Sequence, residues 1–330
     1  MLLAIAGLAA DRAGAEIIKK EDTLRGITMT REECAAKPQT VWLNVYGRDF
    51  CVRYYLSTAG GQGSRPVVFL NGDSNGPISP KGWTWADPSA GFDVDTDDLI
   101  RTADRFSKMA KTTAIYVARI GVEGSSGNHL SRKTLLELHL MNMALEVIKQ
   151  RHRFEGFHLV GQSGGSKLAF GLATMRRDLN CVISGSGRLA AGTAKQQPSD
   201  PGRAYFEVMG SAHMLAQNGA LRMMMITDPA DKAVPAAEQT PMALSLRQAG
   251  RAIPQFFVEA TDAKHHAVVD YGVIAMAGCV LGRSDADIAQ AVGTLVRRNA
   301  DINRRQQDEE RAKNASQTAF GTMPRQPGRS

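Results

Sequence analysis

One serine of this chain has neighbours that suit a nucleophile. Ser163 is the centre of residues 161–165 (GQSGG), which follow the short apolar run 157–160 and precede an Ala- and Leu-rich stretch with helical character. Glycine at the flanking positions lets a strand and a helix meet in a turn that is too tight for a Cβ atom. A serine in such a turn lies at the helix N-terminus, where free N–H groups and the helix dipole favour negative charge. The pattern predicts a serine oxygen that can attack a substrate.

Histidine and aspartate residues late in the chain have the chemistry to activate this serine. A serine hydroxyl is a poor nucleophile until a base takes its proton, and a third group must hold the base. His265 and His266 follow the last predicted strand, while Asp228 and Asp231 follow the strand before it. These residue types are those of a serine–histidine–aspartate relay.

These residues need a scaffold that brings distant segments together. Short apolar segments with strand character alternate with longer segments of helical periodicity, which predicts an α/β fold with a mostly parallel central sheet and helices on both faces. The first two strands form a hairpin that adds antiparallel strands at one edge, and functional residues gather at the carboxyl ends of the parallel strands. The predicted strands are 40–46, 50–56, 66–70, 113–118, 157–160, 180–184, 221–227 and 253–259, and the predicted helices are 96–109, 131–151, 236–249, 268–281 and 284–313.

Three segments resemble the α/β-hydrolase superfamily. Residues 161–165 match its Gly-x-Ser-x-Gly nucleophile elbow, residues 231–235 match an Asp-x-x-Val-Pro segment, and His-Ala-Val at 266–268 resembles the loop that carries its histidine. The resemblance covers residues 40–282. Residues 124–129 (GSSGNH) are similar to a loop of uncharacterised bacterial, often exported, serine hydrolases and esterases. The resemblance implies the α/β-hydrolase fold, with a short lid insertion at about residues 187–219.

The resemblance also assigns roles along the chain. In this superfamily the acid and then the histidine follow the serine. The match favours Ser163 as the nucleophile, Asp231 as the acid and His266 as the base. His265 is the alternative base. Asp228, which precedes a proline, is then a turn residue.

The same superfamily stabilises an oxyanion with two backbone N–H groups. One belongs to Gly164, and the other lies after strand 66–70, where residues 71–73 (NGD) occupy the place of the family's His-Gly-x. This match assigns the second donor to Asp73, or to Ser74 if the Asp73 side chain does not turn away. The predicted substrate contacts are Gln162, Trp83 and Trp85. For Trp83 and Trp85 the alternative is that they only cover the edge of the sheet.

Composition limits the partners and cofactors. The 330 residues carry a formal charge of +7, but residues 297–330 hold eight Lys and Arg against four acidic residues, so no nucleic-acid partner is expected. No apolar run reaches the ~20 residues that span a bilayer. Cys-x-x-Cys, Walker and dinucleotide glycine patterns do not occur, so neither a metal nor another cofactor is predicted. The acidic segment 93–98 departs from a calcium loop and predicts a helix start instead.

The ends of the chain and its cysteines predict location and covalent links. Residues 1–15 resemble a signal peptide that lacks a positive n-region, and a plain N-terminal helix is the alternative. Export to the periplasm or beyond agrees with the four cysteines. We expect a bridge between Cys34 and Cys51. For Cys181 and Cys279 we favour two buried thiols, and a bridge between them is the alternative. The predicted organisation is an irregular extension at 16–39, a hydrolase domain at 40–282, and a charged helix with a disordered tail at 283–330.

The predicted activity is hydrolysis of a small-molecule carboxylic ester through an acyl-enzyme. Two alternatives stand beside it. One is a binding protein that keeps the fold without catalysis, since a fold hosts many functions. The other is amidase or lyase chemistry on the same three residues.

Overall fold

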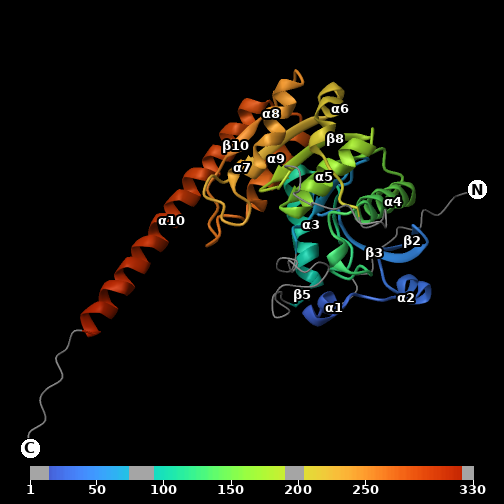
Figure 1. Ribbon diagram of the computed structural model, residues 1–330, viewed down its shortest axis with the longest axis horizontal. Helices are drawn as coiled ribbons and strands as arrows, with labels where there is room; N and C mark the ends of the chain where they lie inside the picture. Colours follow the sequence, from blue (N-terminus) through green and yellow to red (C-terminus); the bar gives the residue numbers. More distant parts are fainter. Residues whose placement is uncertain (1–14, 74–92, 190–203, 322–330) are drawn as a thin grey trace, which may run out of the picture.

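A single eight-stranded sheet forms the centre of the protein (Figure 1). The computed structural model describes residues 15–73, 93–189 and 204–321. The strands of the sheet are β2 Thr40–Val45, β3 Arg48–Ser57, β4 Val67–Leu70, β6 Ala114–Val117, β7 Phe157–Gln162, β8 Leu179–Gly185, β9 Arg222–Thr227 and β10 Gln255–Phe257. Their order is β10-β9-β8-β7-β4-β6-β3-β2; pairs from β10 to β6 are parallel, and β3 is antiparallel to both β6 and β2. The predicted parallel sheet with an antiparallel hairpin at one edge is confirmed.

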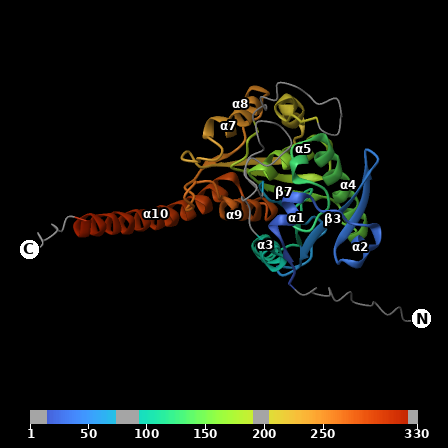
Figure 2. The ribbon, with the colours of Figure 1, turned by 60° about the horizontal axis from the view of Figure 1, so that its bottom comes forward.

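Helices cover both faces of the sheet and enclose two cores (Figures 1 and 2). Successive side chains of a strand point to opposite faces, so Leu159 belongs to the first core and Val160 to the second. The first core is covered by α4 Leu135–His152, α5 Gly164–Met175, α6 Ala212–Gln217 and α8 Pro241–Gln248. The second is covered by α3 Thr96–Ala110, α9 Val269–Val280 and the first part of α10 Asp285–Gly321. The connecting segments contain α7 Ala236–Gln239, η1 His129–Ser131 and η3 Met209–Ser211.

Local structure departs from the sequence expectations in two places. The predicted helix 236–249 is two helices, because Pro241 has no N–H to continue a helix and instead starts α8. Residues 16–39 are not irregular. They contain β1 Ile17–Ile18, which pairs with β5 Val94–Asp95, and the helices α1 Lys20–Arg25 and α2 Arg31–Ala36. A capping box of Thr30 and Glu33 closes the start of α2.

The predicted lid segment 187–219 is described only in part. Residues 190–203 lie outside the described residues. Residues 204–219 form η3 and α6, and their side chains Phe206, Val208 and Leu215 are buried in the first core. This part of the segment therefore packs on the body of the protein.

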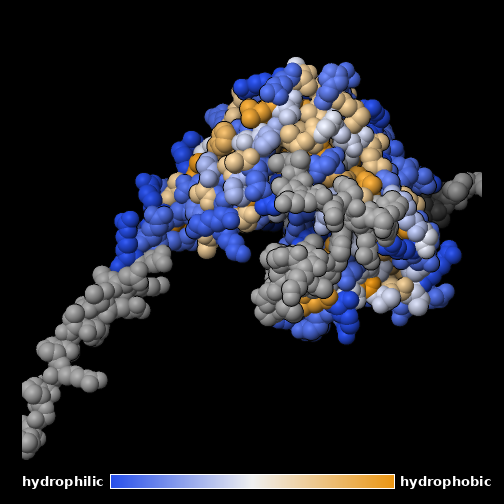
Figure 3. All heavy atoms as spheres, viewed as in Figure 1, coloured by the Kyte–Doolittle hydropathy of each residue, from blue (hydrophilic) through white to orange (hydrophobic). Residues whose placement is uncertain are grey.

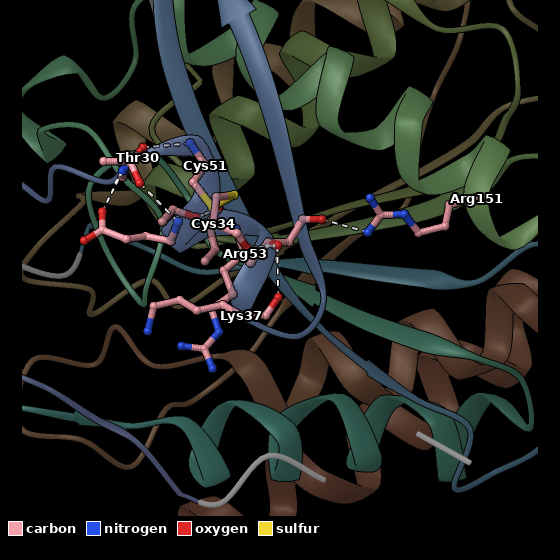
Figure 4. The surroundings of a disulfide bond; sticks show 11 residues. Thr30, Cys34, Lys37, Cys51, Arg53 and Arg151 are labelled. Atoms are coloured by element: carbon pink, nitrogen blue, oxygen red, sulfur yellow. Dashed lines mark hydrogen bonds between the residues drawn. A yellow bond between two sulfur atoms is a disulfide. The ribbon is translucent and has the colours of Figure 1, made fainter. Parts of the chain in front are cut away.

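Two disulfides join elements that are distant in sequence. Cys34 of α2 bonds to Cys51 of β3, as expected, and Figure 4 shows this bridge. Cys181 of β8 bonds to Cys279 of α9, so the expectation of two thiols there is wrong. The reason is tertiary: α9 packs against β8 and brings the two Cα atoms within 6.4 Å, which a disulfide can span.

The C-terminal helix α10 packs on α9 and then projects from the body (Figures 1 and 2). Its buried residues are Ile288, Val292, Leu295, Asn299 and Asn303. Beyond them the coloured surface of the helix is hydrophilic (Figure 3). None of the helices in the described ranges is both long and apolar enough to cross a membrane.

Candidate active site

Ser163 stands in the tight turn between β7 and α5. Its backbone has φ 53° and ψ −118°, a combination that L-residues rarely adopt and that costs roughly 1–3 kcal/mol. Neighbouring glycines permit the turn: a Cβ at Gly161 would lie 2.3 Å from Gly165 O, and a Cβ at Gly165 would lie 2.1 Å from Leu70 O. The sequence pattern therefore reflects real contacts between β7, α5 and the end of β4.

His266 is paired with the acid that the sequence favours. Its Nδ1 atom lies 2.8 Å from Asp231 Oδ2, in hydrogen-bond distance. The Asp231 carboxylate is buried and also accepts hydrogen bonds from the N–H groups of Ala233 and Val234, at 2.8 and 2.9 Å. A fourth donor is Nε2 of Gln239, at 3.0 Å from Oδ2. These four hydrogen-bond partners fix the position of the Asp231 carboxylate.

Sequence reasoning missed Gln239. The residue is fully buried on α7, and its amide group donates to both Asp231 Oδ2 and Val234 O. It lies eight residues after the acid in a short helix. The sequence holds no signal for this role except a glutamine on the buried side of that helix.

His265 has an aspartate partner of its own. Its Nδ1 atom lies 3.1 Å from Asp228 Oδ2. Asp228 also accepts from Ala230 N–H at 2.8 Å, which is the predicted turn, and from Ala260 N–H at 2.7 Å. The loop after β10 is therefore held by two separate histidine–aspartate pairs, and only the pair with Asp231 uses the predicted acid.

Gln162 ties the histidine loop to the elbow. Its Nε2 donates to His266 O at 2.7 Å, and its Oε1 accepts from Val268 N–H at 3.3 Å. These bonds bring His266 beside the residue that precedes Ser163. Within the described chain, the Ser163 hydroxyl makes no hydrogen bond, either to His266 or to another residue. Catalytic hydrogen bonds are often long in the absence of substrate and tighten only in its complex.

A third acidic side chain shapes the same loop. Asp262 accepts from the N–H groups of His266 and Ala267 through Oδ1, at 2.9 and 2.8 Å, and from Lys264 N–H through Oδ2 at 3.2 Å. Burial opposes ionisation of Asp262, but these backbone donors lower its pKa on balance. The charged Asp262 carboxylate therefore holds the backbone of residues 264–267, the loop that carries the His266 imidazole.

The loop after β4 reaches the nucleophile. A Cβ at Gly72 would lie 3.1 Å from the Ser163 Cβ. Gly72 N–H is taken by the Asn71 side chain at 2.8 Å, and Asn71 Nδ2 donates to the buried Glu123 at 3.0 Å. Among the described residues, the N–H groups of Asp73 and Gly164 have no hydrogen-bond acceptor. These are the two predicted oxyanion donors, whereas Ser74, Trp83 and Trp85 lie outside the described residues.

The carboxylate of Asp73 lies in a cluster of cations. Its oxygens are 3.0 Å from Arg119 Nη1, 3.2 Å from Arg132 Nε and 2.6 Å from Lys133 Nζ. Burial favours the neutral acid, but Lys133, Arg119 and Arg132 outweigh it and hold the pKa of Asp73 well below its usual range. Arg119 in turn forms a two-point ion pair with Glu137, at 2.8 and 3.1 Å. Neither the three cations nor Glu137 was singled out from the sequence.

The loop 124–129 supports the sheet edge. Ser126 and Ser125 accept hydrogen bonds from the N–H groups of Cys51 and Arg53 on β3, at 2.7 and 2.9 Å. His129 is fully buried, and its Nδ1 lies 2.9 Å from Ile120 O.

The residues that the structure describes bring no three His, Cys, Asp or Glu side chains into an arrangement that could hold a metal.

Comparison with known proteins identifies the fold. No family model matches the sequence, and a search of curated proteins finds no match. The esterase Pf2001 of Pyrococcus furiosus aligns in two crystal forms at 11% identity over 78% of this chain and 97% and 95% of its own, with TM-scores of 0.50 and 0.51. Est1E of Butyrivibrio proteoclasticus, with ferulic acid bound, has a TM-score of 0.49 at 11% identity over 74% of this chain and 98% of its own. With its mostly parallel sheet and a serine turn between β7 and α5, this chain has the α/β-hydrolase fold.

Proposed function

We propose that this protein is a serine hydrolase that cleaves small carboxylic esters through an acyl-enzyme intermediate. In this proposal Ser163 is the nucleophile, His266 is the base and Asp231 holds His266. The N–H groups of Gly164 and Asp73 stabilise the oxyanion. The wider class, a hydrolase, agrees with the likeness in fold to an esterase.

The first half of the reaction transfers the acyl group to the serine. Ser163 Oγ bonds to the carbonyl carbon while its proton passes to Nε2 of His266, and the carbonyl electron pair moves onto oxygen. When the oxyanion collapses, the bond to the alcohol oxygen breaks, and that oxygen takes the proton from His266. The alcohol leaves, and the acyl group remains on Ser163.

The second half releases the acid. His266 removes a proton from water as the water oxygen attacks the acyl carbon, and a second oxyanion forms at the same donors. Collapse of this intermediate returns the proton to Ser163 Oγ and frees the carboxylic acid. The chain needs no redox partner for these steps.

One observation supports the proposal above all others. The 2.8 Å contact between His266 Nδ1 and Asp231 Oδ2 orients the ring so that its other nitrogen is free to act as base. The contact joins residues 35 positions apart, and Gln162 fixes the same loop to the elbow over 104 positions. Two distant segments are thereby drawn to the strained serine.

A fluorophosphonate probe tests the proposal, because it reacts only with an activated serine. We expect labelling of the wild-type protein and none of Ser163→Ala. The matched control is Ser64→Ala, since Ser64 is exposed before the start of β4, at the amino ends of the parallel strands, whereas Ser163 follows the carboxyl end of β7. Wild-type protein that does not react, or Ser163→Ala that reacts equally, refutes the proposal. Turnover of p-nitrophenyl esters of increasing chain length then defines the acyl group.

The second candidate is a binding protein that has this fold and no catalysis, because one fold hosts many functions. The same probe separates the two candidates. A binding protein leaves the serine unreactive, whereas a hydrolase reacts and turns over ester.

A further inference from the structure

The predicted oxyanion donor Asp73 brings a problem with it. In the proposed mechanism the Asp73 N–H stabilises the negative charge of the oxyanion, yet the side chain of the same residue is a negatively charged carboxylate. In a site of low dielectric, a second negative charge a few ångströms away opposes the oxyanion. The structure must therefore neutralise this carboxylate or direct it away, and how it does so has a consequence for the proposed function, on which this inference rests.

The side chain of Asp73 lies over the first turn of α5. A Cβ on Gly164 would come within 2.1 Å of Asp73 Oδ1, so only glycine leaves room for the carboxylate there. The same Oδ1 lies 3.0 Å from Arg119 Nη1. The guanidinium therefore meets the carboxylate at the point where it is closest to the other oxyanion donor.

Arg119 differs from the other two cations in how it is fixed. Its side chain has no exposed surface, and it pairs with Glu137, which is equally buried. Burial opposes the charge, but Glu137 and Asp73 raise the pKa of Arg119 on balance. Arg119 also donates to Asn71 O at 3.2 Å, so it holds both the backbone and the side chain of the loop 71–73.

The other two cations are less well placed for this task. Lys133 is 30% exposed and bonds to Oδ2, whereas Oδ1 is the oxygen that lies against Gly164. Arg132 also contacts Oδ2, at 3.2 Å. Their charges lower the energy of the carboxylate, whereas Arg119 also holds the loop backbone through Asn71 O.

We propose that Arg119 is a positioning residue of the reaction: by binding Asp73 Oδ1 and Asn71 O, it neutralises the carboxylate beside Gly164 and fixes the loop 71–73, which leaves the Asp73 N–H to the oxyanion. Glu137 keeps Arg119 in place. Arg119 itself does not touch the reacting atoms.

A double-mutant cycle with ester turnover tests this role. The first change is Arg119→Met with Glu137→Gln, which removes both buried charges together and keeps an oxygen at position 137 for the Lys133 N–H. The second change is Asp73→Asn, which removes the carboxylate and keeps the backbone N–H. We expect the first change to lower kcat about 100-fold in the protein with Asp73, with little change in KM, because losing one oxyanion donor has an effect of this size.

In the D73N background, the same first change should lower kcat by no more than about five-fold, since there is no carboxylate charge left to neutralise. Equal losses in both backgrounds would show that Arg119 only supports the fold, and no loss in either would show that it has no role. If R119M/E137Q does not fold, as judged by circular dichroism, Arg119→Lys takes its place in the same cycle. A single ammonium cannot bind Glu137, Asp73 and Asn71 together, so the same dependence on Asp73 is expected.

A matched control removes a comparable ion pair far from the site. Arg176→Met breaks the buried pair with Asp178 at the other end of α5, and we expect an unchanged kcat below the unfolding temperature. Failure of the wild-type protein to react with the fluorophosphonate refutes the proposed function and this inference together. A reactive wild type with equal losses in the cycle refutes the inference alone.

Discussion

The side-chain amide of Gln162 donates a 2.7 Å hydrogen bond to the backbone carbonyl of His266. Gln162 directly precedes the serine in the elbow, and His266 is the partner of Asp231. The bond therefore links the two halves of the candidate relay without passing through the serine hydroxyl. The same side chain accepts from Val268 N–H, so both ends of the amide hold the histidine loop.

Gln162→Glu tests whether this bond positions the histidine. Glutamate has the same shape and still accepts from Val268 N–H, but it cannot donate to His266 O. We expect kcat for ester hydrolysis to fall about ten-fold, which corresponds to about 1.4 kcal/mol in activation free energy, while KM changes little. A residue that only contacts substrate would give a raised KM with kcat unchanged. Steady-state kinetics on one ester distinguishes the two results.

The Asp73 carboxylate should make stability depend on pH in the acid range. Its cationic neighbours hold its pKa well below the usual value, so the unfolded chain takes up a proton at this group before the folded protein does. The stabilisation is thus complete above the pKa of the unfolded chain, about 3.9, and is lost as pH falls further.

Urea unfolding of wild type and Asp73→Asn across this range measures the effect. We expect the difference in free energy of unfolding to be constant above pH ~5 and to shrink below pH ~4. A difference that stays constant throughout the acid range contradicts the assignment of a charged Asp73.

The two disulfides should contribute unequally. The bridge Cys181–Cys279 closes a separation of 98 residues and Cys34–Cys51 one of 17. Loop-closure entropy then makes the loss of the longer bridge about 1.5 kcal/mol more costly. Thermal unfolding of the two double Cys→Ser variants measures this order, with the wild type that holds both bridges as the common reference; equal losses contradict it. Because all four cysteines are bonded, we propose that the chain folds in an oxidising compartment.

The base of α10 should matter for the active site and its outer part should not. Asn303 donates to Glu259 Oε1 at 2.6 Å and to Ala260 O at 3.0 Å, and Ala260 N–H in turn bonds to Asp228, the partner of His265. We expect Asn303→Ala to lower the free energy of unfolding by about 1–3 kcal/mol and to lower kcat. A chain that ends after Gln306 keeps Asn303 and serves as the control; chemical denaturation and ester turnover should match the full chain.

The sequence was most informative where contacts are local. The glycines around Ser163 are adjacent to it in the chain, and the clashes that demand them involve the turn itself and one neighbouring strand. Apolar segments likewise predicted the parallel strands, because burial on both faces dictates composition directly, and two alternating segments joined by a short turn predicted the antiparallel edge. Both expectations on the fold are confirmed.

Side chains that act across the fold left no such signal. Arg119 and Glu137 are 18 residues apart, and nothing in their spacing reveals a buried ion pair beneath the loop at Asp73. Cys181 and Cys279 read as two buried thiols, because their pairing depends on how α9 crosses β8. The roles assigned to Ser163, Asp231 and His266 stay predictions until the probe experiment is done.

The backbone conformation of Ser163 lowers the stability of the folded chain, whereas the proposed reaction needs the hydroxyl of this residue. Glycine adopts positive φ without a Cβ penalty, so Ser163→Gly should unfold at higher urea concentration, with a gain on the order of 1 kcal/mol. Laboratory evolution that rewards heat resistance alone should therefore discard this serine early. A screen that scores turnover in every round would be needed to retain it.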